Sequence, residues 1–222
     1  MAEILITGTS RGIGREMAAR YAAGGDRVYA CARAEADAPT GAGLTPVGLD
    51  VTDDASLASL EARLEGASLD LLICNAGALI ARGGVDDPLY TRAAFEEVLA
   101  VNVTGVFFTI RACLPAIRRG KGKIAIVSSQ MGSNARAKGN AYIYRASKAA
   151  ATNLGSALSK ELAAEGIAVG SYHPGWVRTD MGGTEADISV EESAAGLMQR
   201  FAALNLDNAG CFEFYSGEPI PF

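Results

Sequence analysis

The chain has 222 residues, of which 49% are hydrophobic and 20% charged, as expected for a globular protein and not for a disordered one. Its formal net charge is -5, so electrostatics gives no reason to expect a nucleic-acid or membrane partner. A single histidine and four scattered cysteines argue against a zinc site, and we expect no metal. Because no basic leader precedes the first apolar run, and no apolar run reaches bilayer length, we expect a cytoplasmic protein.

Short apolar runs alternate with longer amphipathic stretches along the chain. The runs predict strands at 4–7, 27–32, 45–49, 69–74, 123–128, 167–172 and 211–214. Helices are predicted at 12–24, 54–65, 88–119 (as two helices), 143–165 and 190–204. Strands that are apolar throughout suit a parallel sheet covered on both faces. We therefore predict an α/β fold, with residues 1–222 forming one Rossmann-type doubly wound sheet of about seven mostly parallel strands and helices on both faces. Residues 178–190 are predicted to be a mobile loop.

A glycine-rich turn follows the first predicted strand directly. Gly8, Gly12 and Gly14 would allow a tight turn and a close approach to a pyrophosphate at the start of the next helix. Its position between a strand and a helix predicts dinucleotide binding. The same residues also match the G-x-S-x-G nucleophile elbow of hydrolases. That reading fails because no strand precedes it to supply an oxyanion hole, and the only possible base is His173.

The second predicted strand indicates which dinucleotide is bound. NAD-binding chains place a carboxylate at the end of this strand for the ribose 2′-hydroxyl. Here the strand ends at Ala32, and Arg33 follows. Arg11 in the glycine-rich turn adds a second guanidinium, and two of these groups suit a 2′-phosphate. We therefore favour NADP(H) over NAD(H).

Tyr144 and Lys148 lie four residues apart in a predicted helix, so their side chains share one face. An ammonium group beside a phenol favours the phenolate, and should lower a pKa that is ordinarily about 10. The pair is thus a candidate general acid and its activator. Taken alone, this spacing is common on solvated helix faces.

Several further motifs occur in a fixed order. They are Thr7-Gly8-x-x-x-Gly12-x-Gly14, Asn75-Ala76-Gly77, Asn102, Ser129, Tyr144-x-x-x-Lys148 and Pro174-Gly175. With these motifs the chain resembles the classical short-chain dehydrogenase/reductase family over nearly its whole length. The segments 173–183 and 210–219 further resemble the C-factor-like carbonyl reductase branch of that family.

The resemblance implies four catalytic residues. Tyr144 would protonate a carbonyl oxygen, and Lys148 would lower its pKa and hold the nicotinamide ribose. Ser129 would bond the substrate oxygen; its neighbour Ser128 competes for this role, but the family's serine stands three residues before a glycine. Asn102 would disturb its helix and hold a water that links Lys148 to solvent.

The cofactor contacts follow from the glycine-rich turn, the two arginines and the resemblance. They are Gly8, Ser10, Arg11, Gly12, Ile13, Gly14, Arg33, Asp50, Val51, Asn75, Ala76, Gly77, Tyr144, Lys148, Pro174, Gly175, Val177 and Thr179. Asp50 resembles the family's adenine contact; a helix cap is the alternative, although Thr52 and Asp53 are better placed for capping. We assign His173 no chemical role. Candidate walls of a substrate pocket, or else ordinary core residues, are Ile80, Met131, Trp176 and Met181.

These observations predict an NADP(H)-dependent oxidoreductase that interconverts a small-molecule ketone or aldehyde with an alcohol. The first alternative is a dinucleotide-binding signalling protein with little turnover, since the C-factor branch is associated with intercellular signalling. The second is an NAD-linked alcohol dehydrogenase. The family resemblance also implies a homodimer or homotetramer formed through the helices at 88–119 and 143–165.

Overall fold

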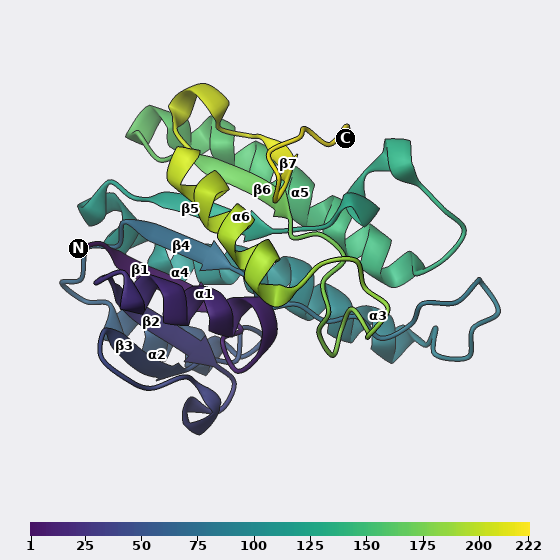
Figure 1. Ribbon diagram of the computed structural model, residues 1–222, viewed down its shortest axis with the longest axis horizontal. Helices are drawn as coiled ribbons and strands as arrows, with labels where there is room; N and C mark the ends of the chain where they lie inside the picture. The colour runs from purple at the N-terminus through teal and green to yellow at the C-terminus, as the bar shows by residue number, and fades with distance from the viewer.

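A computed structural model describes residues 1–222 and contains one seven-stranded sheet (Figure 1). The strands are β1 Glu3–Thr7, β2 Arg27–Ala32, β3 Leu44–Gly48, β4 Leu71–Cys74, β5 Lys123–Val127, β6 Val169–His173 and β7 Phe212–Phe214. Their order is β3-β2-β1-β4-β5-β6-β7, and every neighbouring pair is parallel. The order reverses between β1 and β4, where a doubly wound sheet opens its ligand crevice. The predicted fold class is confirmed.

Helices cover both faces of the sheet (Figure 1). One face packs against α2 Asp54–Arg63, α4 Gly105–Gly120 and α5 Tyr142–Leu162, in a core of 21 buried residues. The other face packs against α1 Gly12–Ala23 and α6 Val190–Ala203, in a core of 14 buried residues. Burial on both faces explains why the strands are apolar throughout.

The predicted helical stretch 88–119 is one continuous helical run and not two separate helices. It comprises α3 Arg92–Leu99, a π-helical turn η2 Ala100–Thr104, and α4. By length and composition this run, Arg92–Gly120, could cross a membrane, so the expectation that no apolar segment is long enough was wrong. In this fold, however, Ile110, Cys113 and Ile117 lie in the core against the sheet. The run is therefore used as a core helix.

Short 3-10 turns connect several elements and were not predicted. They are η1 Glu35–Asp37, η3 Gln130–Gly132, η4 Asn134–Arg136, η5 Ala163–Glu165 and η6 Leu206–Asn208. The loop between β6 and α6 has no helix or strand of its own, as predicted for 178–190. It is nevertheless tied down, because Val177 bridges to Ile188, and the Arg178 amide donates to the Ile188 carbonyl at 3.0 Å.

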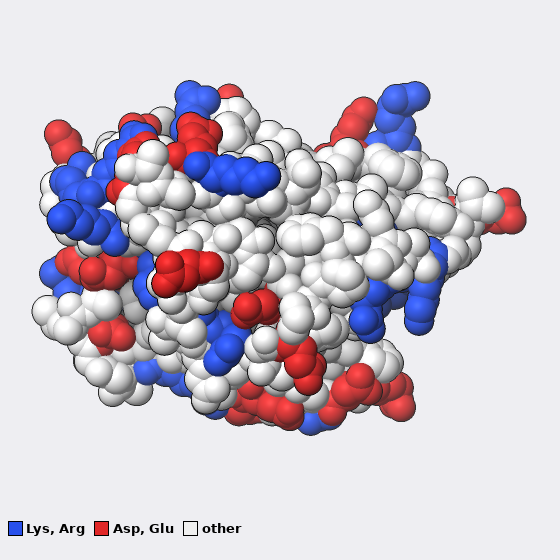
Figure 2. Space-filling model, turned by 90° about the horizontal axis from the view of Figure 1, so that it is seen from above, with Lys and Arg blue, Asp and Glu red and all other residues white.

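Charged side chains of both signs are dispersed over the face shown in Figure 2. They are densest over one end of this face, and a broad uncharged band crosses its middle.

Candidate active site

The predicted site residues converge at the edge of the sheet where β1, β4, β5 and β6 end. The glycine-rich turn leaves β1, Asn75 follows β4, Ser129 lies just beyond β5, and Pro174 follows β6. Helix α5 contributes Tyr144 and Lys148 to the same site. Parallel strands bring these segments to one edge although they are far apart in the sequence.

Tyr144 and Lys148 share one face of α5, as their spacing predicts. The Lys148 ammonium lies 5.6 Å from the centre of the Tyr144 ring. It is buried, and it donates a hydrogen bond to the Val127 carbonyl at 2.9 Å. Tyr144 is half-buried, and its hydroxyl interacts with the side chain of Ser129. The phenol, the serine hydroxyl and the ammonium thus form one cluster.

The pKa values in this cluster differ from the sequence-based expectation. Burial raises the pKa of Tyr144 to about 12, while the Ser129 hydroxyl and the Arg82 charge oppose that rise. Burial also lowers the pKa of Lys148 to about 8. The expectation of a lowered pKa for Tyr144 is therefore wrong for this structure, because desolvation raises the pKa by more than the Ser129 hydroxyl and the Arg82 charge lower it. At neutral pH the phenol is protonated.

The two neighbouring serines have different surroundings. Ser128 is buried, and its hydroxyl lies 2.6 Å from that of Thr152 inside the fold. Ser129 caps η3, accepts a bond from the Met131 amide at 3.1 Å, and faces Tyr144. This geometry supports Ser129 over Ser128 as the substrate contact. The same packing explains why position 132 is a glycine. A Cβ at Gly132 would lie 2.6 Å from the carbonyl carbon of Lys148.

Asn102 lies in the π-helical turn between α3 and α4 and is fully buried. Its side chain donates to the Ala78 carbonyl and to the Ser147 hydroxyl, both at 2.9 Å. It also accepts from the Ala78 amide at 2.8 Å. The expected disturbance of the helix is present, because π turns open the regular bonding ladder. Asn102 thereby fixes the loop after β4 to the helix that bears Tyr144.

The glycine-rich turn is built for close approach. Gly8 and Gly12 have φ angles of +72° and +56°, which disfavour other residues. A Cβ at Gly14 would lie 2.3 Å from the Gly8 carbonyl oxygen. A larger residue at position 14 would therefore push the first turn of α1 away from the glycine-rich turn. The side-chain amide of Asn75 donates to the backbone carbonyls of Thr7 and Gly8 at 3.0 and 3.1 Å, as predicted for a bond to a neighbouring strand. This cradle fits a dinucleotide pyrophosphate.

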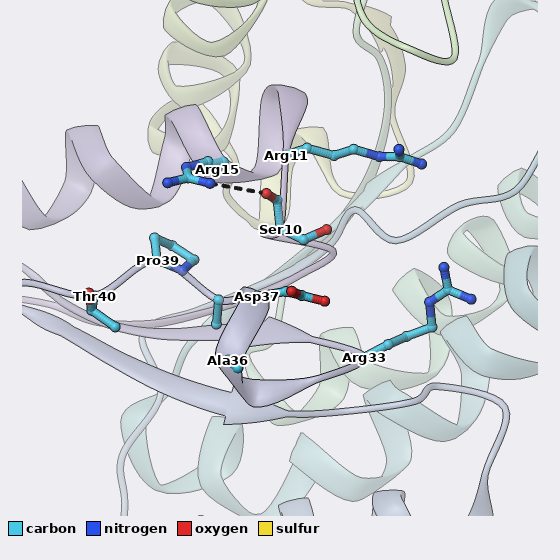
Figure 3. A pocket seen from close by; sticks show the side chains of 9 residues that line it. Ser10, Arg11, Arg15, Arg33, Ala36, Asp37, Pro39 and Thr40 are labelled. Atoms are coloured by element: carbon cyan, nitrogen blue, oxygen red, sulfur yellow. Dashed lines mark hydrogen bonds between the residues drawn. The ribbon is translucent and has the colours of Figure 1, made fainter.

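A cavity of about 650 Å³ opens beside this turn, at the end of β2 (Figure 3). Arg11, Arg33 and Arg15 all line it, so positive charge collects there as the sequence predicts. Arg15 was not predicted, although it lies in the first turn of α1, directly after the glycine-rich turn. In Figure 3, Arg11 and Arg33 extend toward the same side, with Asp37 between them. The Arg11 guanidinium is bound to Asp180 at 2.7 Å, so only part of its charge faces the cavity.

The remaining predicted contacts of the adenosine half lie close by. Ser10 lines the cavity, and its carbonyl accepts from Arg15 at 3.3 Å. Asp50 accepts from the amide and hydroxyl of Thr52, and these bonds, with the charge of Arg33, lower the pKa of Asp50. It does not cap α2, because Asp53 does so by accepting from the Ser56 amide at 2.7 Å.

The remaining predicted cofactor contacts near the glycine-rich turn have the following surroundings. Ile13 packs against the core under α1 and α6, and Val51 packs against the core on the opposite face. The Ala76 amide donates to the Thr7 hydroxyl at 3.0 Å. Gly77 lies beside the catalytic cluster, since a Cβ there would be 3.4 Å from Asn102 and 3.6 Å from the Lys148 ammonium.

The loop after β6 returns to the glycine-rich turn. The methyl group of Thr179 would lie 3.3 Å from a Cβ at Gly12, so the two predicted phosphate contacts are adjacent. Gly175 has a φ of +89°, and a Cβ there would clash with Ile188. The Pro174 carbonyl accepts from Ser193 at 2.6 Å, which fixes the start of the loop.

His173 and the candidate pocket walls are less distinctive. His173 is buried against the Phe214 ring, and burial lowers its pKa to about 4, so it is neutral. Trp176 and Met181 are exposed, while Ile80 and Met131 are half-buried. Partial exposure of these apolar side chains, all in the loops at this edge of the sheet, is compatible with a substrate pocket.

Comparison with known proteins defines the family. Residues 2–188 match the short chain dehydrogenase family, and the chain belongs to it. The chain is 36% identical over 159 residues to the C-signal protein of Myxococcus xanthus, covering 69% of this chain and 93% of that protein. It is 33% identical to the 3-oxoacyl-acyl-carrier-protein reductase FabG of Escherichia coli, covering 92% and 84% of the two chains. The structure of an NADPH-bound carbonyl reductase from chicken fatty liver aligns with a TM-score of 0.87 and 31% identity, covering 100% of this chain and 99% of that one. The chain is therefore an oxidoreductase of the short-chain dehydrogenase type.

Proposed function

We propose that this protein is an NADP(H)-dependent reductase that converts a ketone or aldehyde to an alcohol, with Tyr144 as the general acid. The cluster of Tyr144, Ser129 and Lys148 beside the glycine-rich turn is the observation on which this proposal rests. Resemblance to an NADPH-bound carbonyl reductase supports it. The dinucleotide supplies the hydride when bound.

The side chains have separate tasks in this proposal. Ser129 donates a hydrogen bond to the substrate carbonyl oxygen and shares the negative charge that develops there. Tyr144 is protonated at neutral pH and delivers its proton to the same oxygen. The Lys148 ammonium, 5.6 Å from the phenol ring, stabilises the phenolate that remains. Asn102 positions the loop after β4 through Ala78.

Replacing Tyr144 by phenylalanine tests the proton-donor role. The Tyr144→Phe variant should oxidise NADPH with an activated carbonyl at least about a hundred times more slowly, because general acid catalysis contributes that much or more. Its affinity for NADPH, measured by fluorescence titration, should change little. Tyr142→Phe is the matched control, since Tyr142 lies two residues earlier on the same helix and is exposed. Retained turnover in Tyr144→Phe would refute the role.

The preference for NADP(H) rests on the arginine-lined cavity. The Arg33→Asp variant should lower the ratio of kcat/KM for NADPH over NADH by roughly tenfold to a hundredfold, the value of a charged hydrogen bond. Arg92→Asp, at an exposed arginine at the start of α3, should leave the ratio unchanged. An unaltered ratio in Arg33→Asp would show that the pocket for the 2′-phosphate has been assigned to the wrong residues.

A signalling role is the second candidate, and the name of the Myxococcus xanthus relative favours it. A binder without chemistry has no need of the whole catalytic cluster. A panel of carbonyl substrates tested with both cofactors separates the two candidates, because a pure signalling protein would bind a dinucleotide without turnover.

We also propose that the protein forms a homodimer or homotetramer through the α3–α4 run. Phe95, Leu99 and Phe107 are large apolar side chains that lie exposed there. An exposed apolar surface of this kind is typical of an association site. Light scattering coupled to gel filtration measures the mass, and a monomer of 22.9 kDa would contradict the proposal.

A further inference from the structure

Two loops meet at the rim of the candidate active site through one arginine. Arg82 lies in the loop after β4, and its guanidinium donates a hydrogen bond to the carbonyl of Met181 in the loop after β6. It is exposed and takes part in none of the four salt bridges of the chain. By contrast, the exposed Arg11 and Arg118 are each paired with a carboxylate. Arg82 therefore presents donors that no acidic side chain of this protein satisfies.

The backbone next to Arg82 is held firmly against the start of α5. The Gly83 carbonyl accepts from the Tyr90 hydroxyl at 2.8 Å and from the Ala141 amide at 3.2 Å. The Gly83 amide donates to Asp87 at 2.9 Å. Ala141 immediately precedes the helix that bears Tyr144. The backbone next to Arg82 is thus bonded to the beginning of the helix that bears the candidate proton donor.

The positive charge of Arg82 affects Tyr144, the candidate proton donor. It is the charged side chain that lowers the pKa of Tyr144 against the effect of burial. The carboxylate of Asp87 lies in the same loop, but its two oxygens already accept from the amides of Gly83 and Leu89. The Arg82 guanidinium, which bonds the Met181 carbonyl and has no carboxylate partner, therefore lies where the loops after β4 and β6 meet.

We propose that Arg82 is a specificity-determining residue that binds a carboxylate of the substrate, so that the preferred substrates are carbonyl compounds bearing a carboxylate group. A planar guanidinium matches a carboxylate in shape and charge. The exposed indole of Trp176 and the side chain of Met181 lie in the opposite loop and supply apolar surface for the rest of such a molecule. This inference rests on the proposed reductase function.

A matched pair of aldehydes tests the inference. 4-Carboxybenzaldehyde and methyl 4-formylbenzoate have the same reacting group, and only the first carries a negative charge. The specificity ratio, kcat/KM for the acid divided by that for the ester, is measured with NADPH in the wild type and in Arg82→Gln. Dividing one ratio by the other removes the intrinsic difference in reactivity between the aldehydes.

We expect Arg82→Gln to lower the specificity ratio by roughly three- to tenfold, between the values of an exposed ion pair and of a charged hydrogen bond. Arg82→Lys should recover part of the ratio. Lys138→Gln, at an exposed lysine of the loop before α5, should leave it unchanged. Added salt should lower the ratio in the wild type and have little effect on it in Arg82→Gln.

A binding measurement complements the kinetics. Benzoate cannot be reduced in this way, and it should quench the fluorescence of Trp176, the only tryptophan, at lower concentrations in the wild type than in Arg82→Gln. An unchanged specificity ratio with active enzyme would overturn the inference and show that Arg82 only links the two loops. Failure of the wild type to reduce either aldehyde, or any other carbonyl compound, would instead contradict the proposed reductase function.

Discussion

Replacing Lys148 by methionine should stabilise the protein at neutral pH. The side chain is buried, and burial lowers its pKa to about 8 from an ordinary value of about 10.4. Each unit of pKa corresponds to about 1.4 kcal/mol, so the buried charge costs the folded state about 3 kcal/mol at pH 7. Methionine removes this cost but leaves the Val127 carbonyl without its bond, which costs about 1–2 kcal/mol. We expect a net gain of about 1–2 kcal/mol.

The pH dependence of the difference in stability between wild type and Lys148→Met tests whether the buried charge causes it. Between pH about 8 and about 10.4, the unfolded chain keeps the Lys148 proton that the folded protein has released. The stability of the wild type relative to Lys148→Met must therefore rise with pH in this interval, by at most about 1.4 kcal/mol per pH unit. Below this interval the difference is constant and favours the variant. Above it the wild type should be the more stable of the two, because only its hydrogen bond to Val127 remains.

Urea unfolding of both proteins without cofactor, from pH 6.5 to 10.5, measures this difference. Other groups that titrate in the same range affect both proteins equally and cancel. Lys160→Met is the control, since Lys160 is exposed on the same helix and should show no such pH-dependent difference. A constant difference between wild type and Lys148→Met across the whole range would refute the reasoning from the buried ammonium.

Three further predictions follow from the same cluster. Ser129→Ala should lower kcat by roughly a hundredfold or more. Ser128→Ala should mainly lower the free energy of unfolding, by about 1 kcal/mol, as measured by urea denaturation. Gly132→Ala should destabilise the protein by about 1–3 kcal/mol and slow turnover, because its Cβ would press against the backbone of Lys148; normal stability would show that the loop can move aside. Tyr144 stays protonated from pH 6 to about 8, so kcat/KM for reduction should be constant over this range. Above about pH 8 kcat/KM should fall, because Lys148 loses its charge. A decline that begins near pH 6 would contradict the assignment of Tyr144 as a proton donor with a raised pKa.

The fold could be predicted because local pattern and tertiary environment agree. Each strand is short and apolar on both sides, as a strand buried between two layers of helices must be. The bounds of the elements are shifted by up to four residues; for example, β4 begins at Leu71, while its apolar run begins at Leu69. Leu69 is also fully buried, so its hydrophobicity does not distinguish a strand from a buried turn.

The electrostatics of the site could not be predicted from spacing. A separation of four residues correctly places Tyr144 and Lys148 together, but their pKa values depend on desolvation by residues distant in the sequence. The pairing of Arg11 with Asp180 joins residues 169 positions apart, and no local pattern indicates it. Arg15 could have been found, because it directly follows the last glycine of the glycine-rich turn.

Desolvation of Tyr144 supports the proposed role of this residue as a proton donor. A phenol with a pKa of about 12 stays protonated at neutral pH, and only the protonated form can donate to a carbonyl oxygen. Alcohol oxidation instead requires the phenolate as a base, which burial disfavours. In the proposed mechanism, the Lys148 ammonium near the Tyr144 ring and the charge of Arg82 would stabilise the phenolate that forms once the proton has been transferred. A phenol that desolvation keeps protonated at neutral pH therefore favours the proposed reduction of a carbonyl over the alternative of alcohol oxidation.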